Sequence, residues 1–445
     1  MIRGMRQRRV PLVLLLVLAA MPAPAAAAAS ARADAAIVAR GADAVALAIR
    51  DEAGGATKRF YAERGYRPLW AASGRVGRAA DLLLGHLESA ELDGLKPSSY
   101  DLGKLQARLD AARSGDPRAV ARAEIALSDA LARYVRDQRD PKRSRSAGMI
   151  YADAALKPRK PKPETVLRAA AFPQDLDAYV RDMGWMSQRY VELRTLARRA
   201  VGLGADERAR LALNLDRARL LPGPWTHHVV VDASSGRLWY YGAGKQAGTM
   251  RVVVGAAATQ TPMLAGKLQW AILNPYWNVP TYLARDSIAP KVLAGRSLAS
   301  LKMEALTDWS ADARPLPAAQ VDWRAVAAGE REIRLRELPG PANSMGRVKF
   351  LFPNREGIYL HDTPERDLLK KSDRHFSNGC IRLEDAPALG RWLMQSPLRT
   401  TRGRVEQAVP LPVQVPVYLT YLTATATARG IAFRDDVYGR DTPRS

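Results

Sequence analysis

Residues 361–382 read HDTPERDLLKKSDRHFSNGCIR and contain Cys380, the one cysteine in a chain of 445 residues. Two of the five histidines, His361 and His375, precede it in the same stretch. The separation between His361 and Cys380 is long enough to run from one strand over a loop to the next. A thiol becomes a nucleophile when a nearby base removes its proton. Gly379 places no Cβ near the cysteine, so backbone N–H groups can approach a reacting carbonyl. The stretch predicts a cysteine nucleophile on a strand-rich scaffold.

The two histidines compete for the role of base. We expect His361 to hold it, because His375 lies only five positions before Cys380 and reaches it only if the loop folds back. A buried structural thiol is the alternative for the cysteine; the Ser-x-Gly-Cys setting and the histidines argue against it. His227 and His228 open a strand and are expected to be structural. No pair of His, Asp and Glu has a metal-ligand spacing, so we expect no metal and no cofactor.

Residues 1–29 have the pattern of an export signal. A basic start is followed by an apolar run from Val10 to about Met21, and small residues then offer a cleavage site near Ala27 or Ala29. A membrane-spanning helix needs about 20 apolar residues, and this run is shorter. We therefore expect an exported, periplasmic protein, with an uncleaved N-terminal anchor as the alternative.

The formal net charge is +23, and +19 without the four arginines of the signal. Such a balance is typical of nucleic-acid binding, but export argues against that partner. The anionic partners that remain are lipid head groups and wall polymers, so peripheral contact with the membrane or the wall stays open beside charge that has no specific partner. One cysteine forms no internal disulfide, so stability must come from buried apolar surface. The oligomeric state is not indicated.

The pattern along the chain predicts an α+β fold. About 415 mature residues favour two or three domains. Residues 30–224 have helical periodicity, interrupted by the basic loop LKPRKPKPE at 156–164, whose prolines exclude regular structure. From residue 225 to 441 the segments alternate and are rich in β-branched residues, which predicts a mainly β domain. Within it, an insertion at about 282–332 has the length of an active-site lid.

Five motifs together resemble a known family. They are YLHDTP at 359–364, SNGCIR at 377–382, QTP at 260–262, NPYWNVP at 274–280 and PGPANSMG at 339–346. The chain resembles the L,D-transpeptidases of the bacterial cell wall, whose catalytic module is called the YkuD domain, and is most similar to their long, Gram-negative periplasmic subgroup. FYAERGYRPLW at 60–70 and AELDGLKPSSYDL at 90–102 resemble that subgroup's scaffold domain. No counterpart of the small peptidoglycan-binding module is found.

The resemblance implies roles for single residues. Cys380 matches the nucleophile and His361 its imidazole partner, and Ser377 and Gly379 match the small residues of the motif near the oxyanion. Asn378 departs from the family pattern, which has His there. Arg382 matches the basic residue after the cysteine.

Four neighbouring residues are candidates for positioning or substrate contact. Asp362, or its main-chain carbonyl, is expected to orient the imidazole. Tyr359 and Trp277 are candidates for the pocket wall, with ordinary core packing as the alternative. Arg382 binds a substrate carboxylate or pairs with Glu384 or Asp385; the sequence leaves both open.

The family's reaction supplies the expected function. The thiolate would attack the carbonyl between the third residue of a tetrapeptide stem and its terminal D-alanine. A diaminopimelate amine of an acceptor stem would resolve the thioester, giving a 3-3 cross-link in peptidoglycan biosynthesis, with a role in cell shape and carbapenems as inhibitors. Water as the acceptor would give an L,D-carboxypeptidase. An amidase that releases a wall-linked protein and a non-catalytic wall-binding protein also stay open as functions.

Overall fold

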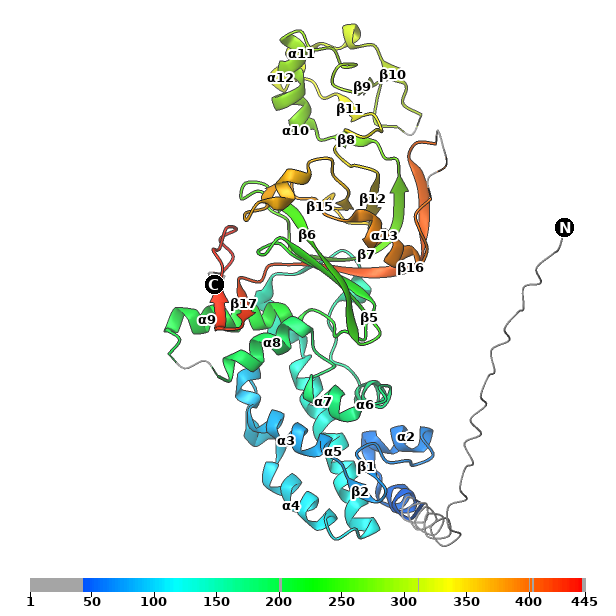
Figure 1. Cartoon of the computed structure of the whole chain (residues 1–445), viewed down its shortest axis with the longest axis vertical. Helices are drawn as coiled ribbons and strands as arrows, with labels where there is room; N and C mark the ends of the chain where they lie inside the picture. Colours follow the sequence, from blue (N-terminus) through cyan, green and yellow to red (C-terminus); the bar gives the residue numbers. More distant parts are fainter. Residues whose placement is uncertain (1–42, 200–201, 311, 400, 402–403, 442–445) are drawn as a thin grey trace, which may run out of the picture.

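Three parts are stacked along one long axis in the computed structural model, which describes residues 43–199, 202–310, 312–399, 401 and 404–441. Helices lie at one end, a β-sheet in the middle and a small insertion at the other end (Figure 1). The expected signal at 1–29 lies outside the described residues. Within the described part, no helix combines the length and apolarity that a membrane crossing requires.

The helical part is organised around α5 (Pro117–Gln138). Asp116 caps this helix by accepting a hydrogen bond from the Ala119 N–H at 2.8 Å, and Pro117 occupies the first helical position. The other helices are α2 (Gly55–Glu63), α3 (Ala79–Glu88), α4 (Leu102–Ala112), α6 (Pro163–Ala171), α7 (Leu176–Arg181), α8 (Gln188–Ala197) and α9 (Ala205–Arg219). Short strands also occur here: β1 (Ala71–Ala72), β2 (Arg75–Val76) and β3 (Ile150–Tyr151). This part is therefore mainly helical, as its periodicity predicts, but it also contains three short strands that the periodicity did not predict.

Buried acids explain the two motifs of the helical part. The Glu124 carboxylate on α5 accepts hydrogen bonds from the Trp70 and Ala71 N–H groups at 3.0 Å, which fixes the FYAERGYRPLW segment. Asp93 of AELDGL forms a buried ion pair with Arg194 of α8 at 2.8 Å. Buried charges persist where hydrogen bonds and partners satisfy them. The motifs thus mark the points where loops are tied to the helices.

The part expected to be catalytic (the catalytic part) is a sheet whose strand pairing closes on itself. Its order is β12-β13-β15-β6-β5-β4-β16-β7, and β7 pairs in turn with β12. The bounds are β4 (His228–Asp232), β5 (Arg237–Gly242), β6 (Lys245–Gly255), β7 (Leu264–Leu273), β12 (Val348–Leu351), β13 (Leu360–His361), β15 (Ile381–Leu383) and β16 (Gln407–Thr420). Strand β14 (His375–Ser377) pairs with β6. Closure leaves these strands with few free edges, and apolar side chains such as Val252, Phe350 and Leu419 form the core.

Helix α13 (Ala386–Met394) packs on this sheet shortly after β15, the strand that follows the cysteine. Its N-terminus is capped by Asp385, which accepts a hydrogen bond from the Ala388 N–H at 2.9 Å. A Cβ on Gly390 would lie 3.3 Å from the Phe350 ring, so α13 approaches β12 closely. This packing fixes the end of β15 and, with it, the position of the cysteine turn.

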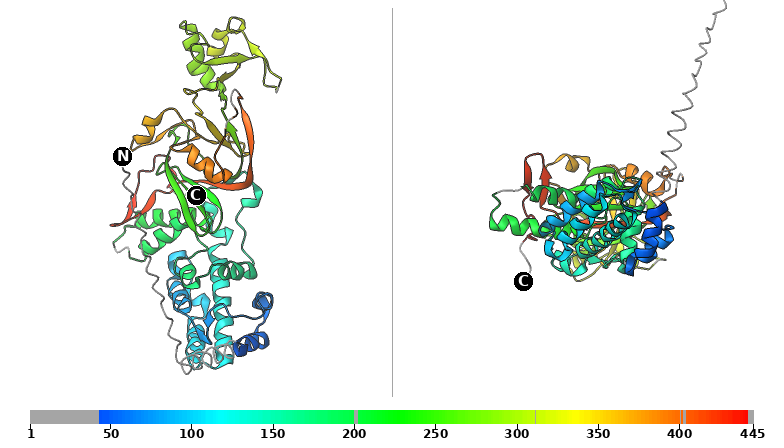
Figure 2. Two further views of the ribbon diagram at one scale, coloured as in Figure 1. Left: turned by 45° about the vertical axis from the view of Figure 1, so that its right-hand side comes forward. Right: turned by 90° about the horizontal axis from the view of Figure 1, so that it is seen from below.

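The insertion is a small folded unit rather than a loop. It contains a sheet in the order β10-β9-β11-β8 and has a hydrophobic core of its own, including Val279, Ala305 and Leu335. Its elements are β8 (Trp277–Val279), α10 (Thr281–Leu283), a π-helical turn (Ala284–Ile288), α11 (Ala289–Leu293), β9 (Met303–Leu306), β10 (Pro315–Leu316), α12 (Trp323–Ala328) and β11 (Arg334–Glu337). Figure 2 shows it beyond the end of the sheet that faces away from the helices.

The helical and catalytic parts share one core. Strand β3 of the helical part pairs in parallel with β7, and one continuous buried cluster contains Leu167, Leu215, Tyr241 and Tyr418. After β16 the chain forms a hairpin, β17 (Ala424–Thr427) and β18 (Gly430–Phe433), against α8 and α9. The physical junction therefore extends well to either side of residue 224.

Candidate active site

Cys380 lies directly before strand β15, and the preferred histidine, His361, lies on the neighbouring strand β13. Strands β13 and β15 are parallel, with Leu360 opposite Ile381 and His361 opposite Arg382. Paired residues on adjacent strands point to the same face of a sheet. The register therefore places Tyr359 beside Cys380, with His361 next along the same face.

The turn before the cysteine is held by hydroxyl groups. Ser377 Oγ donates to the Cys380 carbonyl at 2.6 Å and accepts from the Gly379 N–H at 3.1 Å. Thr261 of the QTP motif donates to the Gly379 carbonyl at 2.7 Å. Gly379 has φ +109°, a conformation that side chains disfavour. The Gly379 N–H, expected to face an oxyanion, is therefore engaged by Ser377, whose role in this state is to hold the turn.

Tyr359 lies beside the thiol. Its main-chain N–H and its hydroxyl are near enough to Cys380 to lower the pKa of the thiol, and the thiol itself donates to the Gly357 carbonyl at 3.7 Å. Burial raises the pKa of the Cys380 thiol to about 11, while the two Tyr359 contacts and the charge of Arg382 act in the opposite direction. The resting thiol is therefore protonated at neutral pH. Tyr359, predicted only as a pocket-wall candidate, is a direct partner of the sulfur.

His361 is buried and uncharged, with its tautomer set by the backbone. Its Nδ1 lies 2.6 Å from the Asp362 carbonyl, which can only accept, so Nδ1 carries the proton and Nε2 is a free base. Burial, together with the smaller effects of the charges of Arg382 and Lys349, lowers the pKa of His361 to about 3. Of the two groups proposed to orient this ring, the main-chain carbonyl of Asp362 makes the contact.

The Asp362 carboxylate hydrogen-bonds to the neighbouring loops rather than to the His361 ring. It accepts hydrogen bonds from Arg366 at 2.6 Å and from the Arg347 N–H at 2.9 Å. Gly346, at the end of the PGPANSMG motif, has φ +61°, and a Cβ there would lie 2.5 Å from this carboxyl group. The glycine thus lets the loop pass close to Asp362, which in turn fixes the carbonyl that holds His361.

His375 lies in a separate hydrogen-bonded environment. Its Nδ1 pairs with Asp373 at 2.5 Å, and its ring packs edge-on against Tyr438, with centroids 5.3 Å apart. Its strand, β14, runs beside Val254 of β6. These contacts fix His375 at the junction with the C-terminal segment, which favours His361 as the base.

Arg382 pairs with neither of the two acids that the sequence suggested, Glu384 and Asp385. Its guanidinium pairs with Glu365, whereas Glu384 pairs with Arg251 of β6. The reason is the antiparallel pairing of β15 with β6, which brings Arg251 to Glu384. Because Glu365 is exposed, a substrate carboxylate could exchange with it.

The insertion contributes a tyrosine that was not predicted from the sequence. Tyr282, 39% exposed, lies close enough to Cys380 for a thiolate to raise the pKa of its phenol, in addition to the larger effect of burial. The signal was available, because Tyr282 lies two residues after Pro280, the last residue of the NPYWNVP motif. Trp277, in contrast, packs against the core of the insertion, and Asn378 is exposed beside the cysteine.

Two family models match this arrangement of parts. The Scaffold domain matches residues 55–196, and the L,D-transpeptidase catalytic domain, YkuD, matches residues 226–415. The chain belongs to the L,D-transpeptidase (YkuD-domain) family. With an N-terminal Scaffold domain and a YkuD domain, it has the α+β organisation expected from its sequence.

A relative from Haemophilus influenzae matches most of this chain. That protein, named "Putative L,D-transpeptidase", is 26% identical over 396 residues, which are 86% of this chain and 77% of the relative. Among solved structures, an L,D-transpeptidase from Mycobacterium smegmatis is 13% identical with a TM-score of 0.22, and covers 44% of this chain. The Ldtfm-avibactam carbamoyl enzyme is 14% identical with a TM-score of 0.22, and covers 45% of this chain. This chain spans 58% and 50% of those two solved chains.

Proposed function

We propose that the protein is a periplasmic cysteine L,D-transpeptidase that forms 3-3 cross-links between diaminopimelate residues of peptidoglycan. The observation that carries the proposal is the shared face of Cys380, Tyr359 and His361, with His361 neutral and unprotonated at Nε2. An exported location is proposed from the N-terminal sequence alone.

Acylation begins from a neutral thiol and a neutral imidazole. His361 Nε2 takes the thiol proton as Cys380 Sγ bonds to the donor carbonyl, and Tyr359 stabilises the developing sulfur charge with its two hydrogen bonds. The tetrahedral oxyanion needs donors of its own; losing one typically slows such a reaction about a hundred- to a thousandfold. The Cys380 N–H is the candidate, since Ser377 already holds that of Gly379.

Collapse of this intermediate breaks the C–N bond and expels D-alanine, whose amine receives the proton from His361. The amine of an acceptor diaminopimelate then attacks the thioester carbonyl, and its proton passes through His361 back to the sulfur. Atoms and charge balance without a metal or a redox partner. Arg382 and the insertion around Tyr282 are positioned beside this path and are candidates to bind stem-peptide groups.

Product analysis with a purified disaccharide-tetrapeptide tests the proposal. The expected products are free D-alanine and a 3-3 linked tetrapeptide-tripeptide dimer. Tripeptide monomer without dimer would contradict cross-linking and identify water as the acceptor. The Cys380→Ala variant, as the control, should give neither product.

A further inference from the structure

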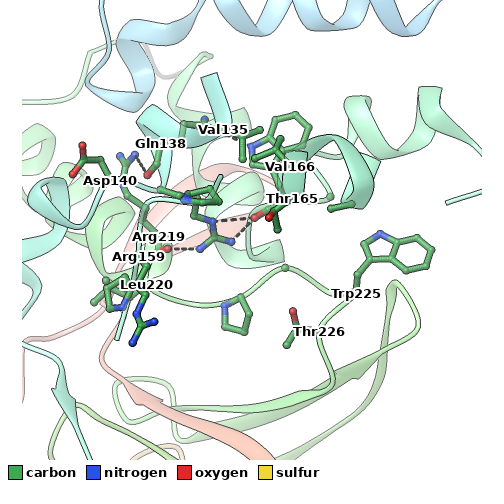
Figure 3. A pocket seen from close by; sticks show the side chains of 18 of the residues that line it. Val135, Gln138, Asp140, Arg159, Thr165, Val166, Arg219, Leu220, Trp225 and Thr226 are labelled. Carbon is green, nitrogen blue, oxygen red and sulfur yellow. Dashed lines mark hydrogen bonds between the residues drawn. The ribbon is translucent and has the colours of Figure 1, made fainter. Parts of the chain in front are cut away.

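A cavity of about 540 Å³ lies between the helical part and the catalytic sheet. Its walls come from α5, α6, the basic loop, the segment after α9, and Tyr418 of β16. Figure 3 shows Val135 and Gln138 along one side, Thr226 across from them and Trp225 at one end. Cys380 and the residues beside it are not among those that line the cavity, and Cys380 instead lies near Tyr282 of the insertion. The cavity is therefore separate from the candidate active site, and its volume is typical of ligand sites.

Two aromatic side chains stand exposed at the cavity. Phe172 is 77% exposed and Trp225 is 40% exposed, and their ring centroids are 5.8 Å apart at an interplanar angle of 86°. Behind them the lining is largely apolar, with Leu156, Val135 and Val166. Exposed aromatic groups that border an apolar hollow mark binding surfaces, and their faces suit the C–H faces of a sugar ring.

A positive charge in the cavity wall has no acidic partner within the described part of the chain. Arg139 donates to the main-chain carbonyls of Trp185, Arg219 and Leu221, at 3.1, 2.8 and 3.0 Å. Burial lowers the pKa of Arg139 to about 10, so the guanidinium stays charged at neutral pH. Carbonyl dipoles hold the group in place but do not cancel its charge, so a carboxylate entering the cavity would gain a favourable interaction.

The other charges on the lining do not neutralise this cation. Asp140 lies 3.4 Å from Lys160, and Arg219 lies 3.4 Å from Asp216, so both are paired. Arg159, at the rim, is exposed and adds positive charge. An anionic ligand is therefore favoured over a neutral or cationic one.

Gln138 supplies an unmet hydrogen-bond donor at the same place. Its side chain is fully buried, and its Oε1 accepts from the Trp185 indole at 2.6 Å. Its Nε2 has no hydrogen-bond partner among the described residues. A buried donor left unpaired costs stability, which an acceptor on a ligand would restore.

We propose that this cavity binds an anionic glycopeptide segment of the wall polymer, at a site distinct from the one around Cys380. A peptide carboxylate faces Arg139 and Arg159, a carbonyl or hydroxyl accepts from Gln138, and a sugar ring lies against Trp225 and Phe172. The choice of polymer rests on the proposed function; the site itself does not. Binding in this cavity would hold the polymer beside the helical part while Cys380 reacts with a stem peptide at the separate active site.

Photo-crosslinking locates the site directly. The probe is a disaccharide-tetrapeptide that carries a diazirine, used with the full chain and its Cys380→Ala variant to prevent turnover. We expect labelled peptides from α6 and from residues 218–226, in addition to any from the active site. Thr165→Trp, which fills the cavity from an exposed position, and Arg159→Glu should each reduce this label at least tenfold. Lys58→Glu, an exposed charge reversal on α2, is the matched control and should leave it unchanged.

Two further measurements separate the failure of this proposal from the failure of the proposed function. The rate at which a carbapenem acylates Cys380 should be the same in Thr165→Trp, Arg159→Glu and the parent chain. If acylation is normal but the cavity is not labelled, or its label is unaffected by Thr165→Trp and Arg159→Glu, the cavity proposal alone is overturned. Cavity label without acylation overturns the cysteine chemistry alone. Competition by the neutral disaccharide as strong as that of the glycopeptide would overturn the assignment to an anionic ligand.

Discussion

At the scale of single residues, the site combines a thiol and an imidazole that are both uncharged at rest. Burial raises the pKa of Cys380 to about 11 and lowers that of His361 to about 3. The pair therefore differs from a preformed thiolate–imidazolium, and the proton must move during attack. Tyr359 is the residue that eases this step, because its hydrogen bonds favour the ionised sulfur.

Removing the Tyr359 hydroxyl tests that role. Tyr359→Phe should raise the pKa of the Cys380 thiol and slow its alkylation by iodoacetamide at neutral pH by up to about tenfold, the effect of one pKa unit. The measurement is the alkylation rate against pH. Tyr240→Phe, which removes a hydroxyl from β5, should behave like the parent chain; an unchanged profile in Tyr359→Phe would refute the assigned contact.

The rate of D-alanine release distinguishes which of the two histidines is the base. His361→Ala should lower the rate of D-alanine release by about two to four orders of magnitude, the usual value of a general base. His375→Ala should retain most of the rate, because its ring is held by Asp373 and Tyr438. The reverse pattern would transfer the role of base to His375.

Burial of neutral His361 also predicts a pH dependence of stability. The folded ring resists protonation until about pH 3, whereas the unfolded ring binds a proton below about pH 6.5. The stabilisation of the folded state by the neutral His361 ring is therefore fully present above about pH 6.5 and is lost as the pH falls toward 3. Urea unfolding should show a smaller loss between pH 7 and 5 in His361→Gln than in the parent chain. Equal losses would mean that the ring is protonated in the folded state.

At the scale of elements, loops from distant parts of the sequence fix the two reacting residues. Thr261 holds the Gly379 carbonyl, and Gly346 makes room for Asp362, whose carbonyl orients His361. The motifs that revealed the family are thus positioning devices. The spacing from histidine to cysteine predicted two strands joined by a loop; β13 and β15 are those strands, and the connection between them also contains the short strand β14.

Gly346→Ala tests this chain of contacts. The added Cβ would meet the Asp362 carboxyl group at 2.5 Å, at a φ of +61° that favours glycine. We expect a loss of about 1–3 kcal/mol in the free energy of unfolding and a lower acylation rate by carbapenem. Gly103→Ala on α4, where nothing lies within 4 Å, is the control. An acylation rate unaffected by Gly346→Ala would separate this loop from the site.

Sequence patterns predicted the elements better than the contacts between them. Helical periodicity over residues 30–224 predicted a mainly helical part, and α5 buries an apolar face there. The ion pair between Arg382 and Glu365, the contact of Tyr359 with sulfur and the approach of Tyr282 depend on strand register and on the fold of the insertion. Neither the strand register nor the fold of the insertion can be read from the local spacing of residues.

At the scale of the whole molecule, the helical and catalytic parts form one structure. Strand β3 extends the sheet, and Asn214 of α9 donates to Thr423 at 3.0 Å and accepts from the Ala424 N–H at 3.1 Å. A boundary placed by the change of periodicity at residue 224 marks a change of secondary structure. It does not mark a break in the core.

This shared core predicts cooperative unfolding. Tryptophan fluorescence and exposure of the Cys380 thiol to alkylation should report the same urea midpoint. Asn214→Leu removes one contact of Thr423 and leaves the Ala424 N–H without the acceptor that Asn214 provides. It should lower both midpoints together and reduce the free energy of unfolding by about 1–3 kcal/mol. Exposure of the thiol at a distinctly different midpoint would mean that the two parts unfold independently.

The proposed chemistry requires that Cys380 is the group that is acylated. Intact mass of the protein after incubation with a carbapenem, followed by peptide mapping, measures this. We predict one adduct per chain, confined to the peptide that contains Cys380, absent in Cys380→Ala and formed far more slowly in His361→Ala. No adduct on the folded parent chain, or an adduct on another residue, would contradict the proposed chemistry.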